Sequence, residues 1–165
     1  MPKRSGGPGR PKSEYGTQFH EKQEVKKSYG LREKQFKRYF TFGASPESVV
    51  ELLESRLDNI VYRAGFAITR KFARQLVSHG HFKVNGKNVD IPSYRAKIGD
   101  EISVHPLSQS IIPFKDLSIT LKKHEPPVWF AIDADKLSIR ILSAPKVDDS
   151  FISSSIKPII EFYSR

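Results

Sequence analysis

The stretch SHGHFKVNGK, residues 78–87, places His79 and His81 one residue apart and close to Lys83 and Lys87. Imidazole groups can bind a metal, transfer protons or donate hydrogen bonds to an anion. A stable zinc site usually has four ligands, and this stretch has no third histidine or cysteine nearby. The sequence therefore predicts no metal and no cofactor. It favours a helix end and a strand start that present basic residues to a partner.

Asp58, in the tetrapeptide SRLD at residues 55–58, is a second candidate for chemistry. The Arg-Leu-Asp order resembles the loop that carries the catalytic aspartate of pseudouridine synthases. The surrounding pattern predicts an amphipathic helix, however, and no separate substrate domain is present, so we interpret Asp58 as one partner of an ion pair on a helix surface. Phosphate-binding glycine loops, serine elbows and HExxH motifs are also missing. The sequence predicts no catalytic residue and no enzyme.

Basic side chains give the pattern that most favours binding. Arg70, Arg74 and His79 fall within about two turns of one side of a predicted helix. Arginine forks and mobile lysines suit phosphate groups. Composition and spacing alone leave RNA binding and an ordinary solvated face equally open. The array as a whole consists of Arg63, Arg70, Lys71, Arg74, Lys83, Lys87 and Arg95.

The charge of the whole chain supports a polyanionic partner. The 165 residues hold 28 Lys and Arg against 18 Asp and Glu, a net charge of +10. Residues 1–45 carry +7, residues 46–105 carry +2 and residues 106–165 carry +1. Nucleic acid is favoured over an anionic membrane, because the basic segment is poor in the Leu and Trp that an interfacial helix inserts.

Two absences narrow the class of protein. The sequence has no cysteine, which excludes disulfides and thiolate chemistry. It has no continuous apolar run of membrane-spanning length and no signal-peptide core. We therefore expect a soluble protein that is not exported by a signal peptide and does not contact a membrane.

Residues 1–13, MPKRSGGPGRPKS, are rich in Pro and Gly and contain nothing to bury. They predict a flexible basic arm that an anion would order. The segment PGRP is similar to short hooks that enter the minor groove of DNA, but composition alone explains it. The candidate RNA-binding residues of the arm are Lys3, Arg4, Arg10 and Lys12.

Helical periodicity begins after the arm. Residues 14–42 predict helices with a break near Tyr29 and Gly30, and their aromatic residues at helical spacing favour a core. Residues 46–65 predict one helix, with Ser45 as N-cap and Gly65 at its left-handed end. A second helix is expected from the Thr69 cap through His79, and Gly80 ends it.

Strand signals follow. Residues 81–84 and 87–91 alternate around Asn85 and Gly86, a strong hairpin signal, and a further strand is expected near 102–104. Two helices, a hairpin and a third strand make residues 46–105 a compact α+β module. Beyond Pro106, residues 116–123, 127–133 and 138–144 predict short strands. Ile156, Ile159 and Ile160 near the chain end must pack on another element.

Three separated stretches resemble one family. Residues 52–102, LLESRLDNIVYRAGFAITRKFARQLVSHGHFKVNGKNVDIPSYRAKIGDEI, are similar to the RNA-binding module of the ribosomal protein S-four family. Residues 29–40, YGLREKQFKRYF, resemble the helical segment before that module in bacterial members, and residues 159–165, IIEFYSR, resemble the family's chain end. The similarity runs over about residues 14–165. The module alone also occurs in pseudouridine synthases, tyrosyl-tRNA synthetases and a heat-shock protein, but the flanking matches favour the ribosomal protein.

The resemblance implies structural RNA binding without turnover, in the small ribosomal subunit of the cytoplasm. Family members bind small-subunit ribosomal RNA early, at a multi-helix junction of the 5′ domain, and nucleate assembly. They contact ribosomal protein S-five and neighbouring small-subunit proteins. They also border the mRNA entry channel, where they influence decoding accuracy. A stand-alone RNA-binding stress or assembly factor is the alternative, and an RNA-modifying enzyme is a weaker one.

The resemblance also carries over candidate RNA contacts. In the module they are Arg56, Arg63, Thr69, Arg70, Arg74, Gln75, His79, His81, Lys83, Asn85 and Lys87. In the preceding helices they are Lys26, Lys27, Arg32, Lys34, Lys37 and Arg38.

The chain departs from the family at its start. Many bacterial members have a longer N-terminal region, in some with a zinc-binding cysteine cluster, whereas this sequence begins close to the basic arm and has no Cys. We expect a short, zinc-free form. We further expect four parts: the arm (1–13), a helical part (14–45) that packs with a C-terminal part (106–165), and the RNA-binding module (46–105) inserted between them.

Overall fold

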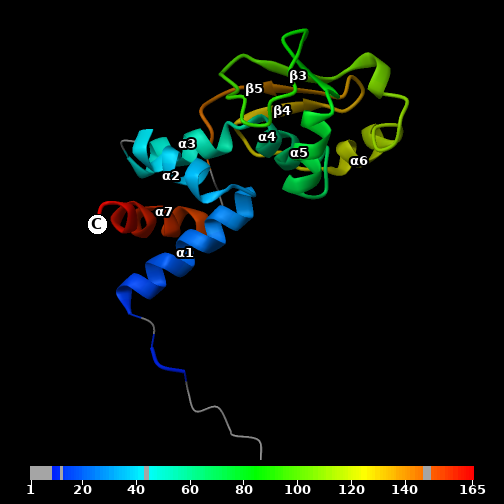
Figure 1. Cartoon of the computed structure of the whole chain (residues 1–165). Coiled ribbons are helices and arrows are strands. Elements are labelled where there is room, and N and C mark those ends of the chain that lie inside the picture. The colour runs from blue at the N-terminus through cyan, green and yellow to red at the C-terminus, as the bar shows by residue number, and fades with distance from the viewer. Residues whose placement is uncertain (1–8, 12, 43–44, 147–149) are drawn as a thin grey trace, which may run out of the picture.

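The fold is α+β, as the sequence predicts. The computed structural model describes residues 9–11, 13–42, 45–146 and 150–165 (Figure 1). The expected arm residues Lys3, Arg4 and Lys12 lie outside the described residues. In chain order the helices are α1 (Glu14–Tyr29), α2 (Glu33–Phe42), α3 (Pro46–Glu54), α4 (Leu57–Arg63), α5 (Arg70–Ser78), the short 3-10 helix η1 (Pro106–Ser108), α6 (Leu117–Lys123) and α7 (Ser150–Tyr163). The strands are β1 (Phe82–Val84), β2 (Lys87–Asn88), β3 (Glu101–Val104), β4 (Phe130–Asp133) and β5 (Ser138–Ile141).

Helices α1, α2, α3 and α7 pack together and form what we call the helical unit (Figure 1). Phe36, Val49 and Ile156 are fully buried in its core. The Ser13 side chain caps α1 by accepting a hydrogen bond from the Gly16 amide, and Gly30 ends the helix in the left-handed conformation at φ 67°. The expected break between α1 and α2 is therefore confirmed.

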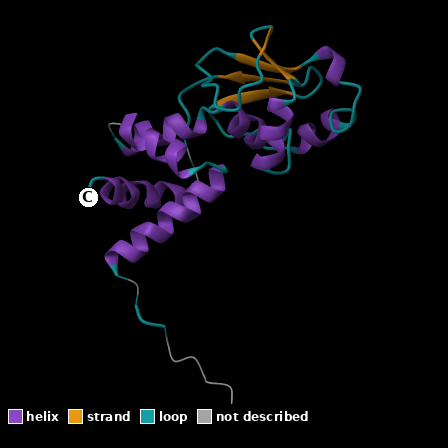
Figure 2. Ribbon diagram, in the orientation of Figure 1, coloured by secondary structure: helices purple, strands orange, loops and turns teal. Residues whose placement is uncertain are grey.

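Residues 57–141 form what we call the sheet unit. Its five strands are all antiparallel, in the order β2-β1-β3-β5-β4. Helices α4, α5 and α6 lie on one side of the sheet (Figure 2). Phe82, Ile102 and Ile139 point into this covered face because every second residue of a strand faces the same way.

The single helix predicted over residues 46–65 is wrong. The helix breaks between α3 and α4, where Arg56 is extended at ψ 138° and pairs with Arg95 as an isolated bridge. The Leu57 amide donates to the Tyr94 carbonyl at 2.9 Å, so the groups freed by the break are satisfied. The apolar periodicity continues across the break because both helices are buried, and periodicity therefore conceals the break.

The strand predicted over residues 116–123 is also wrong, because this segment forms helix α6. Leu117 and Leu121, four residues apart, are both buried, as expected for one helix face. The other two strands predicted beyond Pro106 are present as β4 and β5.

The C-terminal half divides between the two cores. Phe114, Trp129 and Ile141 pack in the core of the sheet unit, whereas Ile152 and Ile159 of α7 pack with α1. Helix α3, expected within the inserted module, contributes its buried residues to the helical unit. The two cores therefore do not follow the expected division of the chain. Helix α3 belongs to the core of the helical unit, and β5 pairs directly with β3 and extends the sheet of the expected module.

Candidate nucleic-acid interface

A buried carboxylate joins the two units. Glu54, at the end of α3, is fully buried, and Arg63 of α4 donates to it from Nε at 2.8 Å and from Nη2 at 2.9 Å. The Tyr29 hydroxyl donates to Glu54 at 2.5 Å, and Asn59 Nδ2 donates at 2.9 Å. Burial and the Glu54 charge raise the pKa of Tyr29 well above its ordinary value, so this hydroxyl stays protonated. We call this cluster the joint.

Arg70, the first residue of α5, also crosses between the units. Its guanidinium lies 4.7 Å from the ring centroid of Tyr29 and 4.6 Å from that of Tyr62. It donates to Asn59 Oδ1 at 3.0 Å and to the Ser28 carbonyl at 3.0 Å. Burial and the nearby Arg63 charge lower the pKa of Arg70. Arg70 therefore holds α1 against α5 while its charge remains next to the surface.

Basic residues surround a pocket at this boundary, which we call the first seam pocket. It has a volume of about 600 Å³ and is lined by Lys27, Ser28, Tyr29, Gly30, Thr69, Arg70, Lys71 and Arg74. Four of these residues are cationic, and no described lining residue carries a carboxylate. Such a pocket suits a phosphate group, which accepts hydrogen bonds and cannot donate them when fully ionised. The structure thus brings together Lys27, Thr69, Arg70 and Arg74 from the predicted set.

Helix α5 continues this surface. The Thr69 side chain caps the helix by accepting from the Phe72 amide, and Arg74 Nη1 donates to the Gly30 carbonyl at 2.9 Å. Lys71, Gln75 and His79, spaced by four residues, are exposed along one side of the helix. Lys71, the second residue after the cap, is not among the residues that the resemblance carries over, although the basic array predicted from the sequence includes it.

The hairpin after α5 has the expected corners. Asn85 and Gly86 both have positive φ, 51° and 81°, which is the turn that the Asn-Gly pair predicts. The Asn85 side chain serves the fold, because it donates to Asp100 at 2.9 Å and accepts from the Glu101 amide at 2.9 Å. Lys83 lies on the face of the sheet opposite Phe82, and Lys87 is exposed. These two lysines remain available to a partner.

His79 and His81 flank Gly80, and their ring centroids are 6.3 Å apart. His81 Nδ1 lies 2.8 Å from the Ser108 hydroxyl, and its ring packs on Phe114 at 5.5 Å. Burial, followed by the proximity of His79 and His105, lowers the pKa of His81. Near neutral pH, His81 is therefore an uncharged hydrogen-bonding group. Within the described ranges, no group of three or more His, Asp or Glu residues is placed to hold a metal ion.

Arg56 and Asp58 form an ion pair, but inside the protein. Arg56 Nε and Nη2 donate to the two Asp58 oxygens at 3.1 and 3.0 Å, and both side chains are almost fully buried. The ion pair predicted for Asp58 is thus present, and its predicted place on a helix surface is wrong. The extended residue at the break turns both side chains inward. Asp58 therefore has a structural role, because both its carboxylate oxygens accept hydrogen bonds from Arg56, and it is not placed to act as a nucleophile.

The remaining predicted residues do not line the first seam pocket. Lys26 forms an ion pair with Glu33 at 3.2 Å, and Arg10 is exposed in the described part of the arm. Exposed basic side chains of α2 and its preceding turn complete the set, namely Arg32, Lys34, Lys37 and Arg38.

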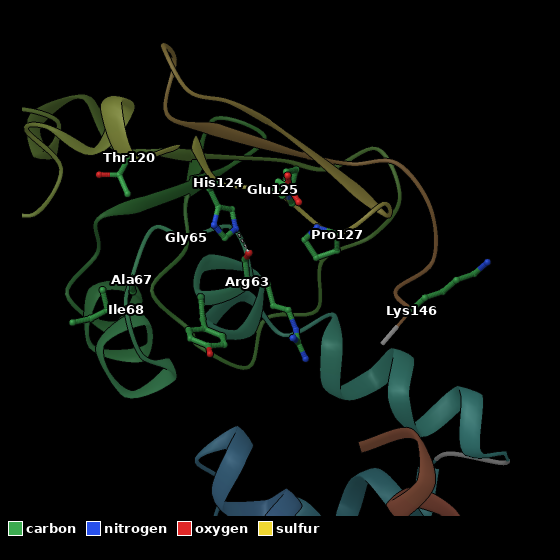
Figure 3. A pocket seen from close by; sticks show the side chains of 11 residues that line it. Arg63, Gly65, Ala67, Ile68, Thr120, His124, Glu125, Pro127 and Lys146 are labelled. Carbon is green, nitrogen blue, oxygen red and sulfur yellow. Dashed lines mark hydrogen bonds between the residues drawn. The ribbon is translucent and has the colours of Figure 1, made fainter. Parts of the chain in front are cut away.

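A pocket beside α6 differs in its chemistry. Figure 3 shows His124 next to Gly65, with a dashed line from the imidazole to Arg63. His124 Nε2 lies 2.9 Å from the Arg63 carbonyl oxygen, and a Cβ at Gly65 would come within 3.1 Å of the ring. The lining of this pocket, about 620 Å³ in volume, includes the carboxylate of Glu125. It is less suited to a polyanion than the first seam pocket.

Comparison of the sequence with known proteins gives matches to two family models. Residues 55–102 match the model of the S4 domain, and residues 1–58 match that of the ribosomal protein S4/S9 N-terminal domain. A protein of Chloroflexus aurantiacus named small ribosomal subunit protein uS4 is 44% identical over 178 residues, covering 99% of this chain and 86% of the relative. The chain belongs to the uS4 family. Further uS4 proteins, from Acetivibrio thermocellus and Caldicellulosiruptor bescii, are 43% and 45% identical over 158 residues, each covering 93% of this chain and 76% of the relative.

Membership of the uS4 family makes this chain a ribosomal protein of the small subunit with an RNA-binding domain, rather than an enzyme. The matched S4 domain contains α4, α5, β1 and β2 and ends within β3. The first seam pocket therefore lies where the S4 domain meets the N-terminal domain of uS4. No helix in the described part of the chain is long and apolar enough to cross a membrane.

Proposed function

We propose that this uS4 family member binds small-subunit ribosomal RNA directly, at a multi-helix junction of the 5′ domain, through the first seam pocket and the exposed side of α5. The observation that carries the proposal is the lining of that pocket, with four cations and no carboxylate among its described residues. Phosphate contacts of this kind supply affinity, and the shape of the folded RNA supplies specificity.

The joint supports an early role in subunit assembly. Lys27 and Arg74 come from different units, and the joint fixes these units relative to each other through a fully buried carboxylate. A surface held in place before binding needs little ordering when RNA arrives. Early binding at a junction would bring several RNA helices together, and in this way the protein would nucleate assembly of the small subunit in the cytoplasm.

Two further surfaces support the proposed partners. Tyr15 and Phe19 are 53% and 41% exposed on α1, and both rings pack against Phe162 of α7. Exposed aromatic groups of this kind suit a protein contact, which we assign to ribosomal protein S-five. Arg10, exposed before α1, suits mRNA near the entry channel. Through these contacts the protein would contribute to translational accuracy beside neighbouring small-subunit proteins.

Reconstitution tests the main proposal. The protein is mixed with the 5′ domain of small-subunit RNA from Chloroflexus aurantiacus, whose uS4 protein is 44% identical, and the complex is washed in high salt. A primary binder protects the junction from chemical probing without any other protein and stays bound. A protein that protects only preformed particles, and that the wash removes, would be the stand-alone stress or assembly factor instead.

A further inference from the structure

A second basic pocket lies between the units and shares no lining residue with the first. We call it the second seam pocket. Its volume is about 560 Å³, which lies within the range of sites for small ligands and is large enough for a nucleotide. The lining residues that carry the argument are Gln35, Arg38, Tyr39, Arg56, Ser93 and Arg95. All six can donate hydrogen bonds, and no described lining residue carries a carboxylate.

The Arg56–Asp58 pair prepares one wall of this pocket. Asp58 takes two hydrogen bonds from the Arg56 guanidinium, so its negative charge is neutralised in the interior. Arg56 Nη1 also donates to the Tyr39 hydroxyl oxygen at 2.6 Å. Because this oxygen accepts a hydrogen bond from a cation, the hydroxyl hydrogen of Tyr39 remains available to an acceptor. An anion in the pocket would receive that hydrogen bond.

Arg95 supplies a cation from a fixed backbone position. Its backbone is held against Arg56, and the Ala96 amide donates to the Ser55 carbonyl at 2.9 Å. Its side chain is exposed, and within the described ranges its guanidinium makes no hydrogen bond or ion pair. Arg38 approaches from α2 of the helical unit. The two arginines therefore line one pocket from opposite units.

We infer that the second seam pocket binds a backbone phosphate of small-subunit RNA, at a nucleotide other than those held at the first seam pocket. The inference rests on the proposed RNA-binding function. Arginine forks match phosphate oxygens, and the half-buried ring of Tyr39 offers a surface for the attached base. An acidic protein segment would use the same cations, but the pocket is wider than a carboxylate requires. RNA is therefore the occupant that the geometry favours.

A tethered probe tests the position of the RNA. Because the chain has no cysteine, Ile91→Cys gives a single attachment point for an iron–EDTA group that releases hydroxyl radicals. Ile91 is 57% exposed and does not line the pocket, but it lies in the same turn as Ser93, where its carbonyl accepts from the Tyr94 amide. Ser78→Cys places the same probe on the exposed side of α5, and Leu107→Cys places it on an 82% exposed residue of η1. With the 5′ domain of Chloroflexus aurantiacus small-subunit RNA, the probes at 91 and 78 should cleave two different stretches.

The outcomes separate the two proposals. Cleavage from residue 78 without cleavage from residue 91 overturns the second pocket and leaves the proposed function intact. Loss of RNA binding in all three proteins overturns both. Cleavage of the same nucleotides from 91 and from 107 also overturns the inference, as does a probe at 91 that cleaves only a neighbouring protein in reconstituted subunits.

The charge of the pocket gives a second test. Replacing Arg38 and Arg95 by Gln should weaken RNA binding about 10- to 100-fold. The negative slope of log K against log salt should become shallower by about 1. Replacing Lys123 and Lys136, two exposed lysines of the sheet unit, removes the same charge and serves as the control. Equal losses in the two double variants would show a general charge effect and overturn the site.

Discussion

Arg63 and Glu54 meet through two parallel hydrogen bonds, from Nε and Nη2 to the two carboxylate oxygens, and the carboxylate is completely buried. Burial alone would lower the pKa of Arg63, but the hydrogen bonds and charge of Glu54 outweigh it and raise that pKa. The resemblance assigns Arg63 to RNA, whereas the structure directs its guanidinium to the joint. Arg56 is likewise paired with a buried carboxylate, and Arg70 is held between the rings of Tyr29 and Tyr62. Lys27, Lys71 and Arg74 are therefore the freer cations of the first seam pocket.

Removing Arg63 should destabilise the protein strongly. In Arg63→Gln, the buried Glu54 carboxylate loses its partner, and a loss of about 3 kcal/mol in the free energy of unfolding is expected. Urea denaturation followed by circular dichroism measures it. The matched control is Arg140→Gln, because Arg140 pairs with Glu101 at 3.2 Å and both are exposed. That control should cost less than about 1 kcal/mol. Equal losses in the two variants would contradict the role assigned to the joint.

Asp58→Ala should likewise act on stability. The sequence alone, which places Asp58 on a surface, predicts at most a modest change. The structure shows Arg56 and Asp58 both buried, so the variant leaves an unpaired guanidinium and should cost about 3–5 kcal/mol. Thermal and urea unfolding measure the loss. A fully stable variant that lacks an RNA modification in cells would instead support the enzyme hypothesis.

The α2–α7 contact should weaken in acid. Burial acts to raise the pKa of Glu33, but hydrogen bonds from Tyr163 and two lysines outweigh it and lower this pKa below its ordinary value. The stabilisation is therefore complete above about pH 4.3, the pKa of an unfolded glutamate, and is lost as pH falls through the lower folded pKa. Wild type should be more stable than Glu33→Gln at pH 7, and the difference should vanish in acid.

Urea titrations of both proteins from pH 7 to pH 2 measure this difference. Tyr163→Phe removes one of the hydrogen bonds and should reduce the difference between Glu33 and its Gln variant. If the difference in stability between wild type and Glu33→Gln grew as pH fell, the lowered pKa of Glu33 would be contradicted.

Gly80→Val should damage RNA binding more than His81→Ala. Gly80 has φ 80°, and a Cβ there would meet no atom within 4 Å, so the cost arises from backbone strain rather than from a clash. That strain, about 1–3 kcal/mol, would shift the end of α5 relative to β1. Filter binding to the 5′ domain RNA compares the variants. A larger loss of RNA binding in His81→Ala would show that the His81 side chain matters more than the backbone conformation at Gly80.

Lys71→Gln should weaken RNA binding without unfolding the protein. Lys71 is exposed at the start of α5 and lines the first seam pocket. Losing one phosphate contact should make the negative slope of log K against log salt shallower by about 1. Binding isotherms between about 50 and 200 mM salt measure the slope. Lys136→Gln, in the turn between β4 and β5, is the control, and an equal change there would contradict the site.

Local signals in the sequence predict the corners of the fold well. Gly30, Gly80 and the Asn85-Gly86 turn occupy left-handed conformations, where a side chain would be strained, so residue type alone indicates them. Ser45 and Thr69 cap helices as their side chains suggest. Each of these features depends on neighbours within a few residues.

Long-range pairing could not be predicted in the same way. The break at Arg56 exists because residues 92–96 supply its hydrogen bonds, and α6 is helical where β-branched residues suggest a strand. The candidate site likewise has features that local sequence predicts and features that depend on long-range contacts. Basic spacing indicates that α5 faces a partner, but only the structure shows that Arg63 is paired with a glutamate of another helix.

Helix α7 packs against α1, which lies more than 100 residues earlier in the chain. During synthesis, the sheet unit can fold once residue 141 has left the ribosome that makes it, whereas α1 waits for a helix that is translated later. A nascent chain would therefore hold a finished S4 domain beside an open apolar groove. If the proposed RNA-binding surface is correct, the order of translation makes docking of the last helix the step that completes it.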